Sequence, residues 1–309
     1  MPTACLVCVS RLRGAMEPTK RLAKKLVLWF DTHAVDPESL TDTQHVDWVR
    51  VVPFIAVHLA CFGVLWVGWS AAAVAVAAGL YVVRMFAITG FYHRYFSHRT
   101  FTTSRVAQFA FALLGASSAQ RGPLWWAAHH RKHHRYADTE RDVHSPRQHG
   151  FWWAHMGWIT APGNFPTDLK EVKDLARYPE LTFLDRFDIL VPALLALGLF
   201  AVGGWQFLIW GFFISTVVLF HCTCFINSLA HVFGRRRYAT ADDSRNSLLL
   251  ALITFGEGWH NNHHKYPGAT RQGFFWWEID LTYYGLWLLE RLKIIWNLHP
   301  VPQRLVEAT

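Results

Sequence analysis

Three short clusters of histidines are the residues of this sequence whose types and spacing could do chemistry. Two clusters share the spacing i, i+3 and i+4; their members are His130, His133 and His134 in one, and His260, His263 and His264 in the other. Residues at this spacing leave the same face of a helix, so each cluster could hold a divalent metal ion. A shorter pair, His93 and His98, adds two further imidazoles.

The number of imidazoles predicts two metal ions. A zinc ion takes about four ligands, so this many histidines exceeds the needs of one ion. Imidazole also suits copper, iron and nickel, whereas iron–sulfur clusters and many structural zinc sites use grouped thiolates. Among the five cysteines, Cys5 and Cys8 have the spacing of a metal or redox site, but no second pair of this spacing or nearby histidine completes a site there. Redox-active iron with open coordination positions fits best, because two irons can act jointly on dioxygen.

Carboxylates are expected close to such a centre, because neutral imidazoles leave it with a net positive charge. Four acidic residues are candidates, and each could equally be a solvated loop residue: Asp138, Asp142, Asp242 and Glu257. The other histidines are expected at the surface or in ordinary hydrogen bonds: His33, His45, His58, His144, His149, His155, His221 and His299. His129, which precedes the second cluster, is expected to lie beside the site or to face solvent.

Long apolar segments flank the histidine clusters and predict the elements that position them. The segments are 51–69, 71–92, 189–202 and 205–229. About 20 apolar residues in a helix cross the roughly 30 Å of a bilayer's hydrocarbon core. Arg84 interrupts the second segment and is expected to snorkel or to face the protein interior. The segments predict an all-α integral membrane protein with four transmembrane helices in two hairpins.

The distribution of Lys and Arg predicts the orientation in the membrane. The turns near Ser70 and Gly203-Gly204 carry neither residue type. Residues 1–50 carry 7, residues 93–186 carry 13, and the region after 231 carries 9. By the positive-inside rule, both termini and all three histidine clusters are cytoplasmic. The formal charge of +8 suits an anionic membrane surface but equally suits ordinary cytosolic loops, so it identifies no partner.

Several other functional classes are disfavoured. No secretory signal peptide is apparent in residues 1–47, and the sequence shows no phosphate-binding loop, solenoid repeat or dinucleotide fingerprint. No nucleic-acid partner is expected. A metal transporter would carry its ionisable ligands deep inside the spanning segments, whereas these histidines lie at the segment ends.

Four motifs of the chain resemble those of membrane fatty acyl desaturases, and the stearoyl-CoA (delta-9) type is the most similar. Residues 93–98 (HRYFSH), 130–134 (HRKHH) and 256–264 (GEGWHNNHH) resemble the three histidine boxes of that family. Residues 227–234 (NSLAHVFG) resemble the family segment that carries a ninth histidine and a water-linked asparagine. The resemblance covers roughly residues 50–290.

The resemblance implies a membrane domain of four helices with a cytosolic helical cap that holds a di-iron site. The implied ligands are His93, His98, His130, His133, His134, His231, His260, His263 and His264, with Asn227 reaching a metal through water. The sequence does not divide them between the two irons. The resemblance also places Gln120, Trp126 and Thr223 at the bend of the family's substrate tunnel. Plain packing is the alternative interpretation of these three residues. The expected domains are a cytosolic or interfacial segment 1–47, the desaturase domain 48–295 and a tail 296–309.

The reaction implied by the resemblance is the introduction of a cis double bond, at delta-9, into a saturated acyl chain, using O2 and two electrons. A membrane fatty acid hydroxylase or alkane monooxygenase with the same histidine boxes is the alternative. Ala128-His129 replace the Arg-Asp pair with which animal members contact CoA. The substrate could therefore be an acyl-CoA, an acyl-lipid or an acyl carrier protein thioester. The electrons are expected from a separate ferredoxin, rubredoxin or cytochrome b5, because no fused cytochrome b5 domain is present.

Overall fold

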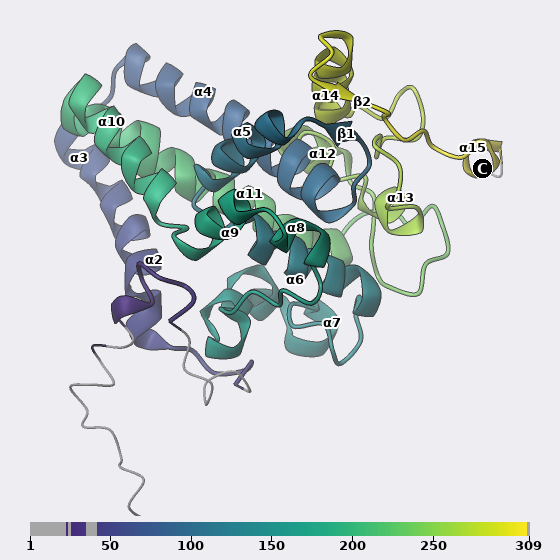
Figure 1. Ribbon diagram of the computed structural model, residues 1–309, viewed down its shortest axis with the longest axis horizontal. Coiled ribbons are helices and arrows are strands. Elements are labelled where there is room, and N and C mark those ends of the chain that lie inside the picture. The colour runs from purple at the N-terminus through teal and green to yellow at the C-terminus, as the bar shows by residue number, and fades with distance from the viewer. Residues whose placement is uncertain (1–22, 24–25, 35–41, 308–309) are drawn as a thin grey trace, which may run out of the picture.

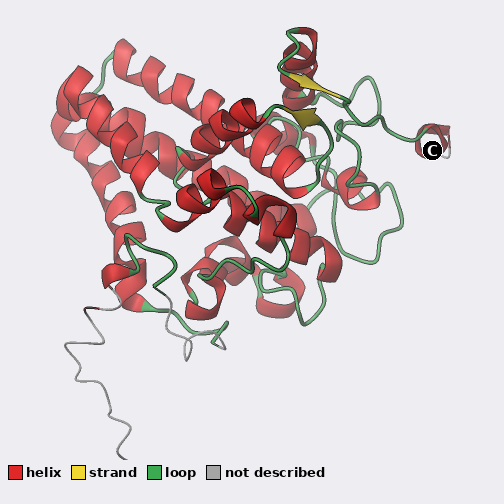
Figure 2. Ribbon diagram, viewed as in Figure 1, coloured by secondary structure: helices red, strands yellow, loops and turns green. Residues whose placement is uncertain are grey.

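The computed structural model describes residues 23, 26–34 and 42–307, which are predominantly helical (Figure 2). In the described part of the chain the strands are β1 (Thr102–Thr103) and β2 (Ile295–Trp296), which pair antiparallel. The predicted all-α class is confirmed at this level. Much of the predicted N-terminal segment 1–47 lies outside the described residues.

Three helical segments of the described chain are long and apolar enough to cross a membrane. They are Trp48–Val67, Ala71–Ser97 and Leu190–His231. The first two contain α2 (Trp48–Ala60), η2 (Cys61–Gly63), α3 (Val64–Val67), α4 (Ala71–Phe86) and the π-helix η3 (Ala87–Ser97). Large apolar side chains point outward from them; Leu65, for example, is 84% exposed. Such segments fit a membrane-embedded protein.

The third segment is a run of consecutive helices that bends at one point. It contains α10 (Leu190–Phe207), the π-helix η7 (Leu208–Ile214), α11 (Ser215–Asn227) and η8 (Leu229–His231). Gly203 and Gly204 have non-helical backbone angles, and Gly204 has a φ of +58°, a conformation that favours glycine. Beyond the bend, η7 packs against α10 and α4 (Figure 1). The glycine pair lies where the sequence predicts a turn between two spans.

Arg84 fixes the position of α4 from inside the helix bundle. Its side chain is fully buried, and its guanidinium donates to Thr216 Oγ1 at 2.7 Å and to Ser215 Oγ at 2.6 Å. The same guanidinium also donates to the carbonyl oxygens of Ser117 and Leu80. Of the two predictions for Arg84, the interior position is confirmed. These bonds join α4 to α11 and to the end of α5, and so they set the place from which η3 emerges.

The remaining helices of the described chain are shorter, and several of them pack against η3 and α11. They are α5 (Arg105–Ala116), α6 (Pro123–Tyr136), α7 (Pro146–His149), η4 (Trp153–Gly157), η5 (Trp158–Thr160), η6 (Pro162–Asn164), α8 (Lys173–Ala176), α9 (Pro179–Arg186), α12 (Leu248–Ile253), α13 (His260–Lys265), α14 (Leu281–Arg291) and α15 (Gln303–Glu307). Helix α6 packs against η3 and α9, and α5 packs against η3 (Figure 1). Phe91 and Phe111 stack at 3.8 Å between ring centroids in the core that η3, α5 and α6 share.

Candidate metal centre

The π-helical winding of η3 brings the first two histidines together. The His98 N–H donates to the His93 carbonyl at 3.2 Å, an i to i+5 bond that defines a π turn. Residues five apart then lie on the same side of the helix, and the two imidazole centroids are 4.9 Å apart. In an ordinary α-helix this spacing would direct the two rings away from each other.

Helix α6 carries the second cluster and is clamped to the end of η3. The Arg131 guanidinium donates to the carbonyl oxygens of Phe96 and Ser97 at 2.8 and 2.9 Å. It also pairs with Asp174 at 2.7 Å. Arg131 lies between the histidines in sequence but points out of the site, so it holds the two histidine-bearing helices in register.

Helix α13 carries the third cluster and has only six residues, too few to be stable alone. Its two asparagines are fully buried and hold it in place. Asn261 Oδ1 accepts from the N–H groups of Arg237 and Tyr238 at 2.8 and 2.7 Å. Asn262 Nδ2 donates to Glu278 Oε2 at 2.8 Å. The asparagines within the HNNHH motif therefore position its histidines.

The structure divides the nine predicted histidine ligands into two groups with no residue left over. The five-histidine group is His93, His98, His130, His134 and His263; the four-histidine group is His133, His231, His260 and His264. Within each group, one ring nitrogen per residue lies within 4.8 Å of all the others. The groups adjoin, because the His134 and His264 ring centroids are 4.4 Å apart.

Helices α6 and α13 each contribute two histidines to one group and one histidine to the other. His130 and His134, at i and i+4, stay together on α6, and His260 and His264 do the same on α13. The i+3 histidine of each helix joins the other helix's group. Adjacent residues on a helix differ by about 100° in direction, so each HH pair straddles two sites. The expectation that each three-histidine cluster holds a metal ion of its own is therefore wrong.

The nitrogen atoms fit bound cations better than an imidazole network. His263 Nε2 lies 3.0 Å from His93 Nε2 and 2.8 Å from His134 Nε2. A neutral imidazole has one N–H, so three converging nitrogens cannot satisfy one another by hydrogen bonds. His264 Nε2 is buried without a hydrogen-bond partner among the described residues. A metal ion at each convergence would accept these lone pairs.

Burial keeps the imidazoles in the neutral form that binds metals. Loss of hydration, together with the charge of neighbouring rings, lowers the pKa of His98, His130 and His134 well below the usual value. The same causes lower the pKa of His260 and His263. Neutral rings offer lone pairs at ordinary pH, which is the form that metal ligation requires.

All four predicted carboxylates lie behind ligand imidazoles. The Nδ1–H groups of His133, His231 and His264 donate to a carboxylate at 2.9, 2.8 and 3.0 Å, and His93 Nδ1 contacts Glu257. The three acceptors are Asp142, Asp138 and Asp242, in that order. Such a bond fixes the tautomer and leaves the Nε2 lone pair for the metal. Although burial opposes ionisation, His264 holds the pKa of Asp242 below its usual range.

The carboxylates are distributed unequally. Three of the four support histidines of the four-histidine group, while Glu257 alone serves the five-histidine group. The group with fewer neutral ligands therefore has more negative charge close by.

A small cavity of about 40 Å³ borders both groups and contains several predicted residues. His93, His130, His133 and His260 line one part of it, and α4 and α11 line the other through residues such as Met85 and Ile226. Trp126, Thr223 and Asn227 also line this cavity. Trp126 stacks on His130 at 5.0 Å, and Gln120 Nε2 donates to Thr223 Oγ1 at 3.1 Å. The predicted tunnel residues thus lie together beside the histidines.

Sequence reasoning missed His144 as a neighbour of the site. Its ring stacks on His133 at 4.4 Å, and its Nδ1 lies 3.5 Å from Asp142 Oδ1. His133, Asp142 and His144 form a third possible metal-holding group. Only the sequence proximity of His144 to Asp142 could have signalled this. His129 points elsewhere and packs between the rings of Trp125 and Trp158 at 4.5 and 5.4 Å.

Comparisons with known proteins give a consistent result. The family model described as fatty acid desaturase matches residues 66–283. The sn-2 palmitoyl-lipid 9-desaturase of Nostoc sp. (strain 36) is 39% identical over 84% of this chain and 93% of the relative. The sn-1 stearoyl-lipid 9-desaturase of Anabaena variabilis is 38% identical over 82% and 93%. The chloroplastic palmitoyl-monogalactosyldiacylglycerol delta-7 desaturase of Arabidopsis thaliana is 35% identical over 88% and 71%.

Proposed function

The chain belongs to the fatty acid desaturase family, and from this premise we propose that it introduces a cis double bond at delta-9 of a saturated acyl chain. The overall reaction consumes O2, two electrons and two protons and forms the alkene and two water molecules. The observation that carries the proposal is the convergence of nine imidazoles in two metal-sized groups beside a cavity lined by membrane-facing helices. The comparisons do not favour a hydroxylase, since the relatives are named desaturases.

Two iron ions are the proposed cofactor. One would be held by the five-histidine group and the other by the four-histidine group, and Asn227 would contribute through water. When bound, the irons supply the activation of dioxygen and the removal of the two hydrogens. The carboxylates behind the imidazoles keep the Nε2 lone pairs directed inward, and Trp126 and Thr223 shape the adjacent cavity.

Shape rather than affinity is proposed to select the bond that is oxidised. Each buried methylene contributes about 0.8 kcal/mol wherever it lies along an acyl chain, so apolar contacts alone do not set the register. The bend near Gln120, Trp126 and Thr223 is proposed to place two neighbouring methylenes beside the histidine groups. The bond from Gln120 to Thr223 ties the loop before α6 to α11 at this bend.

An acyl chain esterified in a membrane lipid is the proposed substrate, in preference to a CoA or carrier-protein thioester. Two of the relatives described above carry "lipid" in their names, and a third acts on a galactolipid by its name. Burial lowers the pKa of His129 to about 3, so this residue brings no positive charge to a CoA phosphate. Its ring also packs between those of Trp125 and Trp158 at 4.5 and 5.4 Å.

Four membrane crossings are proposed, with the bend at Gly203-Gly204 as the turn between the last two. The Lys and Arg counts support cytoplasmic termini and a cytoplasmic metal centre. The proposed domains remain a segment 1–47, a desaturase domain 48–295 and a tail 296–309. Electrons are proposed to come from a separate ferredoxin, rubredoxin or cytochrome b5.

Expression in a desaturase-deficient host tests this function. We expect new delta-9 monoenes in the membrane lipids, located by chemical derivatisation and gas chromatography. Alcohols in place of alkenes would indicate a hydroxylase. The absence of either product from an iron-loaded protein supplied with a reductant would contradict the proposal.

A further inference from the structure

The chain after the third histidine cluster exposes side chains of a restricted kind between residues 276 and 296, a stretch that contains α14 and β2. The acids of this stretch are withdrawn from the surface, because Glu278 and Asp280 are fully buried and Glu290 is half-buried. Every exposed side chain is apolar, aromatic or basic, and together they form what we call the apolar patch: Trp276, Trp277, Ile279, Leu281, Tyr284, Trp287, Leu288, Arg291, Leu292, Lys293, Ile294 and Trp296.

The composition of the apolar patch is typical of a lipid–water interface. Trp and Tyr concentrate at the level of the lipid head groups, and Lys and Arg extend from there to lipid phosphates. The Arg291 guanidinium lies over the Trp287 ring at 4.9 Å, which keeps a cation beside the aromatic side chains. Soluble proteins rarely expose so many large apolar side chains together.

Helix α14 carries apolar side chains on its outer side as well as on its inner side. On the inner side Thr282 and Leu286 are fully buried, and Thr282 Oγ1 lies 2.7 Å from Thr89 Oγ1 of η3. On the outer side Tyr284 and Leu288 are 43% and 53% exposed. A surface helix of a soluble protein is polar on the side that faces away from the core, so the outer side of α14 fits an apolar surrounding better than water.

The apolar patch adjoins the exposed surface of the second candidate span, Ala71–Ser97. Helix α14 packs against η3, the last part of that span. A Cβ on Gly285 would lie only 2.4 Å from the Phe86 ring, so α14 rests directly on this residue. About one turn earlier in the span, Val82 and Val83 are exposed. In Figure 1, α14 runs across the direction of α4, as expected of a helix that lies along a membrane surface.

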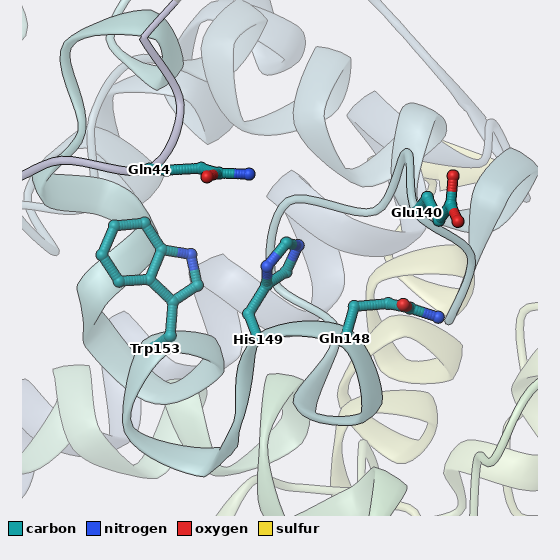
Figure 3. Close-up of a pocket in the computed structure, with 5 residues that line it drawn as sticks. All are labelled: Gln44, Glu140, Gln148, His149 and Trp153. Atoms are coloured by element: carbon teal, nitrogen blue, oxygen red, sulfur yellow. The ribbon is translucent and has the colours of Figure 1, made fainter.

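The surface around the hollow shown in Figure 3 is of a different kind. This hollow has a volume of about 660 Å³, and its lining residues are Gln44, Glu140, Gln148, His149 and Trp153. Trp153 is the one apolar residue among them, and Glu140 is an exposed acid. This lining suits water, so it provides a control position for a test of lipid contact.

A buried arginine connects α14 to the five-histidine group. Asp280 caps α14, because its Oδ1 accepts the Tyr283 N–H at 2.9 Å. Arg94 Nη2 lies 2.9 Å from Asp280 Oδ1 and 3.3 Å from Glu257 Oε1. Glu257 in turn contacts His93 Nδ1. The position of α14 is therefore linked to a proposed metal ligand through charged groups that are all buried.

We propose that the apolar patch lies among the lipid head groups of the bilayer, and that this contact keeps Glu257 in place behind His93. Asp280 and Arg94 transmit the position of α14 to Glu257. The two cations of the patch meet lipid phosphates. The lipid contact is independent of the reaction, whereas its effect on His93 rests on the proposed function and its metal centre.

A nitroxide label tests the lipid contact. The label is attached to Leu288→Cys, and to Glu140→Cys as the water-facing control, in protein whose native cysteines are replaced by serine and which is placed in phosphatidylglycerol nanodiscs. We expect the label at position 288 to collide mainly with oxygen, which concentrates in lipid, and the label at position 140 to collide mainly with a water-soluble nickel chelate. Collision of the label at position 288 with the nickel chelate would overturn the proposal. Exclusion of both reagents would also overturn it, because a second copy or another protein would then cover the patch.

Chelator titration of the iron-loaded protein in the same nanodiscs tests the link to the metal centre. Leu288→Asp places a charge in the apolar patch, and Leu169→Asp is the matched control, since Leu169 is an exposed leucine between Asp168 and Lys170. We expect Leu288→Asp to release one of the two irons at about tenfold lower chelator concentration, as is typical when a carboxylate that supports a ligand is disturbed. The control should release iron as the wild type does.

Asp280→Asn separates the two halves of the proposal, because it weakens the link to Arg94 without changing the patch. We expect easier release of one iron from this variant, while the label at position 288 still reports lipid. Unchanged iron release from both Leu288→Asp and Asp280→Asn would overturn the link to His93. If the wild type binds no iron, the proposed function fails, and the nitroxide label still decides whether the patch contacts lipid.

Discussion

Replacement of Asp242 by asparagine should weaken one of the two metal sites and spare the other. Asp242 Oδ2 accepts the Nδ1–H of His264 at 3.0 Å, while Oδ1 accepts the Ser244 N–H at 2.9 Å. In Asp242→Asn the amide oxygen keeps the bond to Ser244, so the amide NH2 faces His264. That group donates, which forces Nδ1 of His264 to accept and moves the ring proton to Nε2. His264 then has no lone pair for the metal.

The size of the effect follows from the kind of bond that is lost. A hydrogen bond to a charged group contributes about 1.5–3 kcal/mol, and about 1.4 kcal/mol corresponds to a tenfold change in an equilibrium constant. We therefore expect roughly 10- to 100-fold weaker metal binding, as is typical when such a supporting carboxylate is lost. The five-histidine group does not contain His264 and should keep its affinity.

Iron content per chain, measured while a chelator is titrated into the iron-loaded protein, provides the assay. The wild type should release both irons only at high chelator concentration, in one step or two. Asp242→Asn should release one iron at a much lower chelator concentration. The neighbour Asp243, which faces Arg147 and Arg236 at 3.7 and 3.6 Å, supplies the control Asp243→Asn, and surface pairs of this kind contribute little. If Asp242→Asn retained both irons as firmly as the wild type does, or lost both equally easily, the two-site assignment would be refuted.

Three further predictions concern the site and the helices around it. His133→Ala should abolish desaturation and leave the circular dichroism spectrum unchanged; retained turnover would count against the metal centre. Arg84→Met should lower the free energy of unfolding in detergent by about 3 kcal/mol, because it leaves buried hydroxyl and carbonyl groups without a donor; unchanged thermal unfolding would disprove this clamp. The part-buried Asp174 carboxylate loses hydration, which alone would raise its pKa, but Arg131 lowers it to about 2. The stability from this pair is present above about pH 4 and is lost as the pH falls through about 2. Acid unfolding of Asp174→Asn should therefore depend less on pH in this range, and an unchanged pH dependence would show that the pair is not stabilising.

Several features of the fold and the site could be predicted from local sequence patterns. The apolar segments predicted helices of the right type and place, and the glycine pair 203–204 marked the bend of the third segment. The i, i+3, i+4 spacing placed three histidines on one helix in both α6 and α13. These features depend on residues close together in the chain, so helix geometry and hydrophobicity suffice to infer them.

Other features of the site depend on winding and packing that no local pattern specifies. The π turn that joins His93 to His98 was not predicted, nor was the position of His144 against His133. The pairing of His231 with Asp138, which are far apart in sequence, was open among four candidate acids. Such contacts are set by which surfaces of distant elements meet.

The sequence by itself determined three things: the nine candidate imidazoles, the candidate acids, and the apolar helices that flank the histidine clusters in the chain. Only the tertiary structure decided how the imidazoles divide, five to one group and four to the other. The reason is geometric. Adjacent residues on a helix point about 100° apart, so His133 and His134 must face different neighbours. Which neighbour each one meets depends on how α6, α13 and η3 pack, and buried side chains such as Arg131 and Asn262 fix that packing.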